Sequence, residues 1–121
     1  MTADAHCPGI LVVDDDPDIR DSLREVLEDE GYGTVCVSNG REALDYLRSG
    51  KRPCVILLDL MMPVMDGWQF RREQKQDAVI ADIPLIVITA TGKRPVLVDA
   101  DELVMKPLDL TRLFEAIDRY C

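Results

Sequence analysis

The sequence has little of what several protein classes depend on. Among its 121 residues there is one histidine, His6, close to the amino terminus and poorly placed for catalysis. No apolar run approaches the ~20 residues that a membrane-spanning helix needs, and the amino-terminal residues lack the basic and apolar regions of a secretion signal. We therefore expect a cytoplasmic protein with no membrane partner.

Cysteine is also scarce, and its spacing carries no metal-binding signature. The four cysteines are widely separated and form no CxxC pair: Cys7, Cys36, Cys54 and Cys121. Two of them lie in apolar runs, where cysteine behaves as a small hydrophobic residue. We expect neither a disulfide framework nor a zinc site.

Positive charge is in short supply as well. The chain has 14 lysines and arginines against 23 aspartates and glutamates, for a net charge of −9. Nucleic-acid binding relies on basic side chains that neutralise phosphates. We therefore expect protein or cation partners and no nucleic acid, and we interpret Arg71, Arg72 and Lys75 as a solvated helix face.

What the sequence does have is an alternation of short apolar runs and helical patterns. Apolar runs typical of buried parallel strands occur at 10–13, 34–37, 55–58, 85–88 and 103–105. Helical patterns lie between 17 and 31, at about 40–48 and 66–76, and from 110 onward. Capping signals precede three of these helices: Asp16 with Pro17, Asn39 with Glu42, and Asp109.

This alternation predicts a single α/β domain. Strands joined by right-handed helical crossovers form a three-layer α/β/α sandwich around a five-stranded parallel sheet. Residues 90–103 leave room for only one or two helical turns, so we expect a shortened or irregular fourth helix. We assign residues 1–8 to a tail and 9–121 to the domain.

Polar residues end four of the predicted strands, and parallel strands meet at one sheet edge where ligands bind. They are Asp14 with Asp15, Asp59, Thr89 and Lys106. Carboxylates ~4 Å apart repel by about 1 kcal/mol in water and about 4 kcal/mol at an effective dielectric of 20. Three together must shift their pKa or hold a cation, and oxygen ligands favour Mg²⁺, with Mn²⁺ as a substitute.

Carboxylate, divalent cation, ammonium and hydroxyl groups together are also typical of phosphoryl transfer. Aspartate can act as the nucleophile and form an aspartyl phosphate. Positive charge from the cation and from Lys106, with a hydrogen bond from Thr89, would stabilise the equatorial oxygens.

Four motifs in order closely resemble the receiver domain of two-component response regulators, of the chemotaxis-regulator type. They are VVDDD at 12–16, LLDLMMPVMDG at 57–67, ITA at 88–90 and KP at 106–107. The resemblance extends over nearly the whole chain and implies a flavodoxin-like sheet with the strand order 2-1-3-4-5. It also implies phosphorylation by a sensor histidine kinase or phosphotransfer protein, and signalling through an unknown downstream protein.

The resemblance also implies a role for each site residue. Asp59 is similar to the phosphoacceptor, and Asp14 and Asp15 to the acid pair that holds Mg²⁺. The backbone carbonyl of Met61 matches a further metal ligand. Thr89 and Lys106 match the hydroxyl and the lysine that contact the phosphoryl group. Such a receiver is a signalling protein that catalyses only its own Mg²⁺-dependent phosphotransfer and dephosphorylation.

Two features depart from the family and keep alternatives open. Leu103 replaces the usual aromatic switch residue, and the span from Thr89 to Lys106 is shorter than usual. A pseudo-receiver that binds proteins constitutively is therefore one alternative. A small aspartate-based phosphatase of the haloacid-dehalogenase type is another, because Asp14 and Asp16 have its DxD spacing. A complete chain would be a stand-alone receiver, and a partial one a module of a larger regulator.

Overall fold

The computed structural model describes residues 9–59, 64–89, 100–105 and 109–121. Five strands form one parallel sheet in the order β2-β1-β3-β4-β5. Their bounds are β1 (Ile10–Val13), β2 (Thr34–Val37), β3 (Val55–Asp59), β4 (Leu85–Thr89) and β5 (Glu102–Met105). The helices of the described residues are α1 (Pro17–Asp29), α2 (Gly40–Arg48), α3 (Gly67–Gln76) and α4 (Leu110–Asp118).

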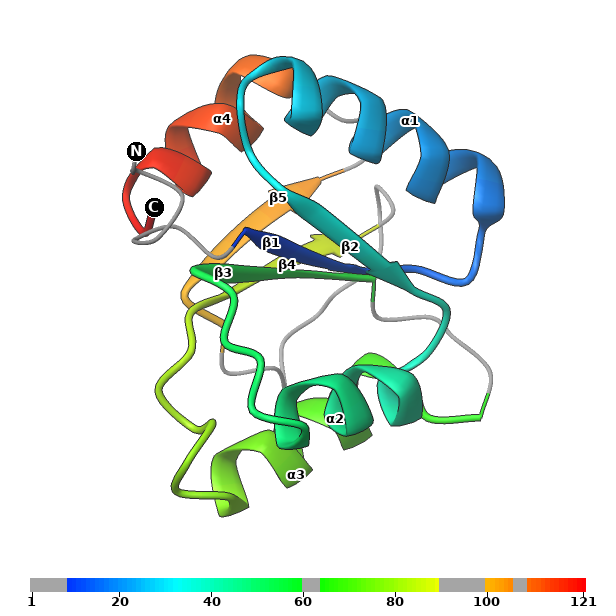
Figure 1. Cartoon of the computed structure of the whole chain (residues 1–121), viewed down its shortest axis with the longest axis vertical. Helices are drawn as coiled ribbons and strands as arrows, with labels where there is room; N and C mark the ends of the chain where they lie inside the picture. The colour runs from blue at the N-terminus through cyan, green and yellow to red at the C-terminus, as the bar shows by residue number, and fades with distance from the viewer. Residues whose placement is uncertain (1–8, 60–63, 90–99, 106–108) are drawn as a thin grey trace.

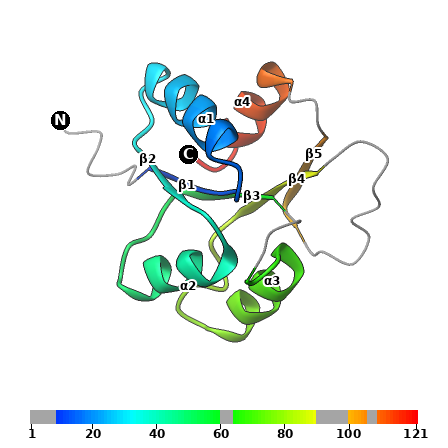
Figure 2. The ribbon, with the colours of Figure 1, turned by 90° about the vertical axis from the view of Figure 1, so that its right-hand side faces the viewer.

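The helices form two layers around the sheet. Helices α1 and α4 cover one face and α2 and α3 the other (Figures 1 and 2). The predicted three-layer sandwich and the strand order are therefore confirmed. The predicted short fourth helix falls on residues 90–99, which lie outside the described residues, as does the tail 1–8. None of the helices described is long and apolar enough to cross a membrane.

Local capping signals set the start of α1 as expected. Asp16 is the N-cap, and its side chain accepts a hydrogen bond from the Asp18 N–H at 2.9 Å. Pro17 occupies the first turn, where its missing N–H leaves no bond unmade. Gly31 follows the helix with a φ of 94°, the left-handed conformation that ends many helices.

The start of α2 differs slightly from a capping box. The Asn39 side chain accepts from the Glu42 N–H at 2.9 Å, as predicted. The Glu42 carboxylate, however, accepts from the Ser38 N–H at 2.8 Å and from its hydroxyl at 2.9 Å. The reciprocal bond thus reaches one residue further back, and these bonds lower the pKa of Glu42 below its usual range.

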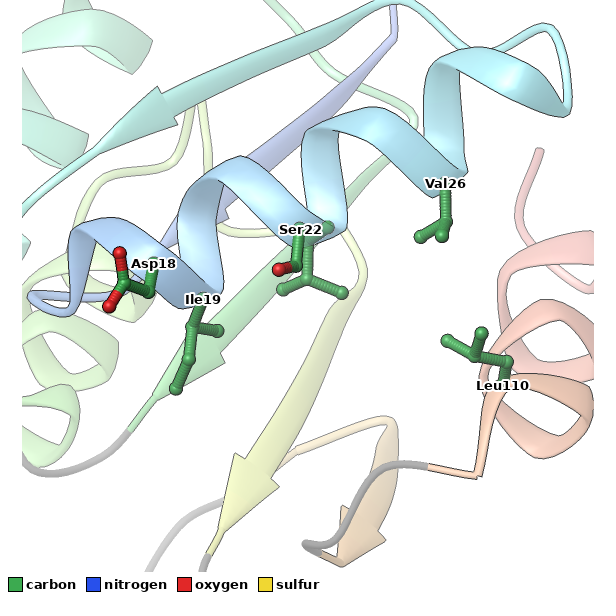
Figure 3. A pocket seen from close by; sticks show the side chains of 6 residues that line it. Asp18, Ile19, Ser22, Val26 and Leu110 are labelled. Atoms are coloured by element: carbon green, nitrogen blue, oxygen red, sulfur yellow. The ribbon is translucent and has the colours of Figure 1, made fainter.

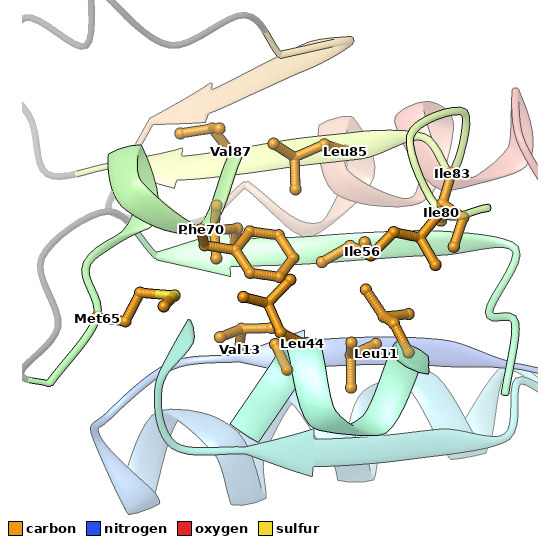
Figure 4. Close-up of a cluster of buried hydrophobic side chains, with 13 residues drawn as sticks. Leu11, Val13, Leu44, Ile56, Met65, Phe70, Ile80, Ile83, Leu85 and Val87 are labelled. Atoms are coloured by element: carbon orange, nitrogen blue, oxygen red, sulfur yellow. The ribbon is translucent and has the colours of Figure 1, made fainter. Parts of the chain in front are cut away.

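The core consists of two apolar layers, one on each face of the sheet. Strands β1 and β3 are buried along their whole length, which explains their unbroken aliphatic sequences. Figure 4 shows the layer beneath α2 and α3, where the fully buried Phe70 ring packs among aliphatic side chains from β1, β3 and β4.

The interpretation of Arg71 as part of a solvated face is wrong. Arg71 is 6% exposed and donates to the Gln74 side chain at 2.7 Å. Gln74 in turn donates to the carbonyls of Ile80 and Ile83 at 2.9 and 3.1 Å, and Asp101 lies 3.7 Å from Arg71. The inner face of α3 is therefore partly polar. A hydrophobic pattern cannot reveal a buried arginine that is neutralised by partners distant in sequence.

The expectation that the cysteines form no disulfide framework is also wrong for one pair. Cys54 and Cys121 are joined by a disulfide, with Cα atoms 5.4 Å apart. Cys54 directly precedes β3, and Cys121 follows α4. Their separation of 67 residues hides this proximity in the sequence, because only the packing of α4 against the sheet brings the two together.

Candidate metal centre at the carboxyl ends of the strands

The sheet register places two aspartates side by side. Val13, the last residue of β1, pairs with Leu58 of β3, so that Asp14 and Asp59 follow on neighbouring strands. The Asp14 N–H donates to the Val37 carbonyl at 3.2 Å, which continues the β1–β2 ladder by one residue. The backbone of the central strands therefore fixes where both carboxylates begin.

Three carboxylates converge at this edge, as the sequence predicts. Oxygen atoms of Asp14, Asp15 and Asp59 lie within 4.8 Å of one another. Asp14 and Asp59 are buried, with 3% and 8% of their surface exposed, whereas Asp15 is exposed. Mutual repulsion is stronger for the two buried groups, and a hard dication with oxygen preference fits this donor set. No histidine or thiolate belongs to the cluster within the described residues.

Asp14 is held by contacts on both its backbone and its side chain. Its carboxylate accepts from the Asp16 N–H at 2.9 Å. Its carbonyl accepts from the Arg20 guanidinium at 2.7 Å, a contact that reaches back from the second turn of α1. Sequence reasoning missed Arg20. A basic residue six positions after Asp14, in an acidic segment, is the only signal that pointed to it.

Met65, which lies just before α3, packs tightly on the start of α2. The Gly40 N–H donates to the Met65 carbonyl at 3.1 Å. A Cβ atom at Gly40 would meet that carbonyl oxygen at 2.9 Å, so a larger residue there would push Met65 away. Val64 has a φ of 68°, which is unfavourable for a β-branched residue.

The remaining predicted site residues are placed less completely. Thr89 ends β4, and its backbone pairs with that of Met105 at the end of β5. Lys106 directly follows Met105 in the sequence, but Lys106 and Met61 lie outside the described residues. The backbone of β4 and β5 thus runs to the same edge as the three aspartates.

The other aspartates of the first acidic segment have structural positions. The Asp16 side chain caps α1, and Asp18 is exposed in its first turn. Asp14 clusters with Asp15 and Asp59 and not with Asp16. This arrangement does not favour the phosphatase alternative, which needs the first and third aspartates of the segment to act together.

An apolar groove opens beside the acidic edge. It lies between α1 and α4 and has a volume of about 280 Å³. Figure 3 shows Ile19, Ser22 and Val26 on α1 facing Leu110 of α4, with Asp18 in the first turn of α1. The lining residues are Asp18, Ile19, Ser22, Leu23, Val26 and Leu110.

Residues 10–118 match the model of the response regulator receiver domain. Because this match covers most of the chain, the protein belongs to the receiver domain family of response regulators, which are signalling proteins of two-component systems. The strand order and the paired acids at the carboxyl edge are consistent with that membership.

The chain is similar in sequence to named bacterial proteins over most of its length. It is 35% identical over 116 residues to sporulation initiation phosphotransferase F of Bacillus subtilis, covering 92% of this chain and 91% of that protein. It is 35% identical over 117 residues to response regulator Rre1 of Synechocystis sp., covering 92% of this chain and 50% of that regulator. The chain therefore spans about half the length of the larger regulators that it resembles.

Solved structures share the fold. The receiver domain of a signal transduction histidine kinase from Syntrophus aciditrophicus superimposes with a TM-score of 0.83 at 36% identity, covering 93% of this chain and 89% of that one. The receiver domain of sensor histidine kinase PA1611 from Pseudomonas aeruginosa has a TM-score of 0.85 at 25% identity, covering 92% and 94%. That second structure contains a magnesium ion coordinated in its active site cleft.

Proposed function

We propose that this receiver accepts a phosphoryl group on Asp59 from the phosphohistidine of a sensor kinase or phosphotransfer protein. The observation that carries the proposal is the convergence of Asp14, Asp15 and Asp59 within 4.8 Å at one sheet edge. Such a cluster is unfavourable unless positive charge balances it, and phosphoryl transfer needs positive charge at the same place.

The chemistry assigns one role to each group. A carboxylate oxygen of Asp59 attacks the phosphorus, and the bond from phosphorus to the histidine nitrogen breaks with its electron pair remaining on the imidazole. Asp14, Asp15 and Asp59, with the Met61 carbonyl, would hold Mg²⁺ or Mn²⁺, which supplies charge neutralisation when bound. Lys106 and Thr89 would contact the phosphoryl oxygens. Water later hydrolyses the aspartyl phosphate, so the protein catalyses only its own phosphorylation cycle.

The groove between α1 and α4 supports a protein as phosphodonor. It is lined mainly by apolar side chains and includes Asp18, which follows Asp15 by three residues in the sequence. An apolar helix of a donor protein seated there would bring a neighbouring phosphohistidine toward Asp59. We further propose that the receiver occupies residues 9–121, with 1–8 as a tail, and that it works in the cytoplasm.

The test is the mass of the protein after treatment with acetyl phosphate, with and without Mg²⁺. We expect a phosphate's added mass with Mg²⁺, a similar gain with Mn²⁺, and none in Asp59→Asn. Asp21→Asn is the matched control, because Asp21 is an exposed aspartate on α1 outside the cluster.

Two outcomes would refute the proposal. No adduct with any small phosphodonor, together with partner binding that is unaffected by Asp59→Asn, would favour a pseudo-receiver. Steady turnover of a phosphomonoester that survives Asp59→Asn would favour a phosphatase.

A further inference from the structure

Two cysteines, Cys54 and Cys121, lie at the amino edge of the sheet, opposite the edge that carries the three aspartates. Cys54 precedes β3 at its amino end, and Cys121 follows the last turn of α4. Their sulfur atoms are bonded, and their Cα atoms are 5.4 Å apart, within the range that a disulfide allows without backbone movement. Figure 1 shows the carboxyl terminus beside the start of β3.

Noncovalent contacts already hold both cysteines in place. The Cys54 N–H donates to the Gly9 carbonyl, and the Cys121 N–H to the Ile117 carbonyl, each at 2.9 Å. Around Cys121, Arg119 forms an ion pair with Glu102 at 2.8 Å. The Tyr32 hydroxyl donates to Asp118 at 2.7 Å, which joins the end of α4 to the segment before β2. The two thiols of a reduced chain would therefore stay adjacent, and closing the bond would require little loss of freedom.

Cys121 differs from the other two described cysteines in its access to solvent. Cys121 is exposed, Cys54 is half-buried, and Cys36 is half-buried on β2. Burial is the main reason that the pKa of Cys36 is raised, so its thiol stays protonated and reacts poorly with disulfides. Cys121 is therefore the point of entry for a reagent, and Cys54 is the thiol that completes the bond.

We propose that Cys54 and Cys121 form a reversible dithiol–disulfide site that exchanges with low-molecular-weight disulfides such as glutathione disulfide. The Cys121 thiolate attacks one glutathione sulfur, forms a mixed disulfide and releases one glutathione thiolate. The Cys54 thiolate then attacks the Cys121 sulfur, closes the protein disulfide and releases the second. Two protein thiols are oxidised, one glutathione disulfide is reduced to two glutathione molecules, and the two thiol protons pass to them or to solvent.

The disulfide encloses the second half of the domain, from Cys54 to Cys121. It closes a loop with a sequence separation of 67 that includes Asp59, Thr89 and Lys106 but excludes Asp14 and Asp15. Cross-linking a loop of this length restricts the unfolded chain, and it limits local opening of the last turn of α4 further than the noncovalent contacts do. The site thus adjusts the stability of α4 without using the aspartate chemistry.

The experiment uses the full chain with Cys7→Ser, because Cys7 lies outside the described residues and could compete for exchange. The protein is equilibrated with glutathione and glutathione disulfide at a series of ratios, starting from either redox state. Mass spectrometry after alkylation counts the thiols. We expect one reversible two-thiol transition, and a melting temperature about 10 °C higher in the oxidised form.

Matched variants make the result specific. Cys54→Ser and Cys121→Ser should each abolish the transition and the shift in melting temperature, whereas Cys36→Ser should keep both. Hydrogen exchange of the amides at 117–121 should slow on oxidation. Asp59→Asn should leave the redox transition intact. The redox proposal and the phosphorylation proposal can therefore be refuted separately.

Three outcomes would overturn the proposal. The first is a glutathione adduct at Cys121 that never closes on Cys54. The second is a bond that reduced glutathione cannot open at any ratio, which would mean a permanent structural disulfide. The third is equal melting temperature and equal amide exchange in the two redox states.

Discussion

The two edges of the sheet have opposite chemistry. The carboxyl edge gathers Asp14, Asp15 and Asp59, which repel one another. The amino edge carries attractive ties: the Cys54–Cys121 bond, the Arg119–Glu102 ion pair and the Arg71 network. The sheet tolerates the repulsion at its proposed phosphorylation site because stabilising contacts lie elsewhere in the same sheet.

The amino edge is also tied from strand to strand. Asp101 accepts from the Leu85 N–H at 2.8 Å, and its own N–H donates to the Leu85 carbonyl at 2.9 Å. Asp101 thereby joins the starts of β4 and β5 and lies 3.7 Å from the buried Arg71. Substitutions at the two edges should therefore separate activity from stability.

The largest expected effect is at the carboxyl edge. Asp15→Asn removes one proposed metal ligand, so the rate of Mg²⁺-dependent phosphorylation should fall by about 100-fold. Without metal, the same substitution relieves repulsion and should stabilise the fold by about 1 kcal/mol. Phosphorylation time courses and denaturant unfolding in EDTA measure the two changes.

Asp18→Asn is the control for that substitution. Asp18 is an exposed first-turn residue of α1. Its loss should cost about 0.3 kcal/mol through the helix dipole and leave the rate of phosphorylation by acetyl phosphate nearly unchanged. Equal rates for Asp15→Asn and Asp18→Asn would contradict the division of labour between these two aspartates.

The amino edge should respond in the opposite way. Arg71→Ala leaves Gln74 and Asp101 without their guanidinium partner, so unfolding should become easier by about 2–3 kcal/mol. Phosphorylation measured well below the melting temperature should change little. Arg72→Ala, on the exposed side of α3, should stay within about 0.5 kcal/mol of wild type in urea unfolding.

Substitution of Arg20 should affect both the stability of the fold and the rate of phosphorylation. Arg20→Gln removes the hydrogen bond to the Asp14 carbonyl, which should reduce stability by about 1 kcal/mol and slow phosphorylation by about 10-fold as Asp14 loses its fixed position. Raising the Mg²⁺ concentration should restore part of the rate. Arg24→Gln, exposed on the same helix, is the comparison, and an equal loss in both variants would argue against a positioning role.

The smallest expected effect is at Glu42, whose carboxylate already accepts hydrogen bonds from Ser38. Hydrogen bonds from Ser38 lower the pKa of Glu42 below 4.5, so its contribution to stability is complete above that pH and is lost as pH falls through the lower, folded pKa. Because Glu42 is exposed, we expect less than about 0.5 kcal/mol. In thermal unfolding, Glu42→Gln should flatten the fall in stability that accompanies acidification below the ordinary pKa of glutamate.

Much of the fold followed from local patterns. The aliphatic runs at 10–13 and 55–58 predicted β1 and β3, and the capping roles of Asp16, Asn39 and Asp109 predicted where three helices begin. The cluster of Asp14, Asp15 and Asp59 was predictable too, because parallel strands bring their carboxyl ends to one edge.

Other features had no local signal. The apolar stripe of α3 was weak because its inner face includes Arg71 and Gln74 beside Phe70. Their burial depends on the carbonyls of Ile80 and Ile83 and on Asp101, which the fold brings beneath the helix. Arg20 was missed because its partner is a backbone carbonyl, which every residue possesses.

The sequence by itself determined the strands, the helix starts and the three aspartates, because these depend on residue type and short spacing. Only the tertiary structure decided that Cys54 meets Cys121, that Arg71 is buried and that Arg20 holds Asp14. The disulfide and the burial of Arg71 depend on contacts between segments distant in sequence, and the Arg20 contact on how α1 leaves the sheet. Neither composition nor hydrophobic periodicity predicts these contacts.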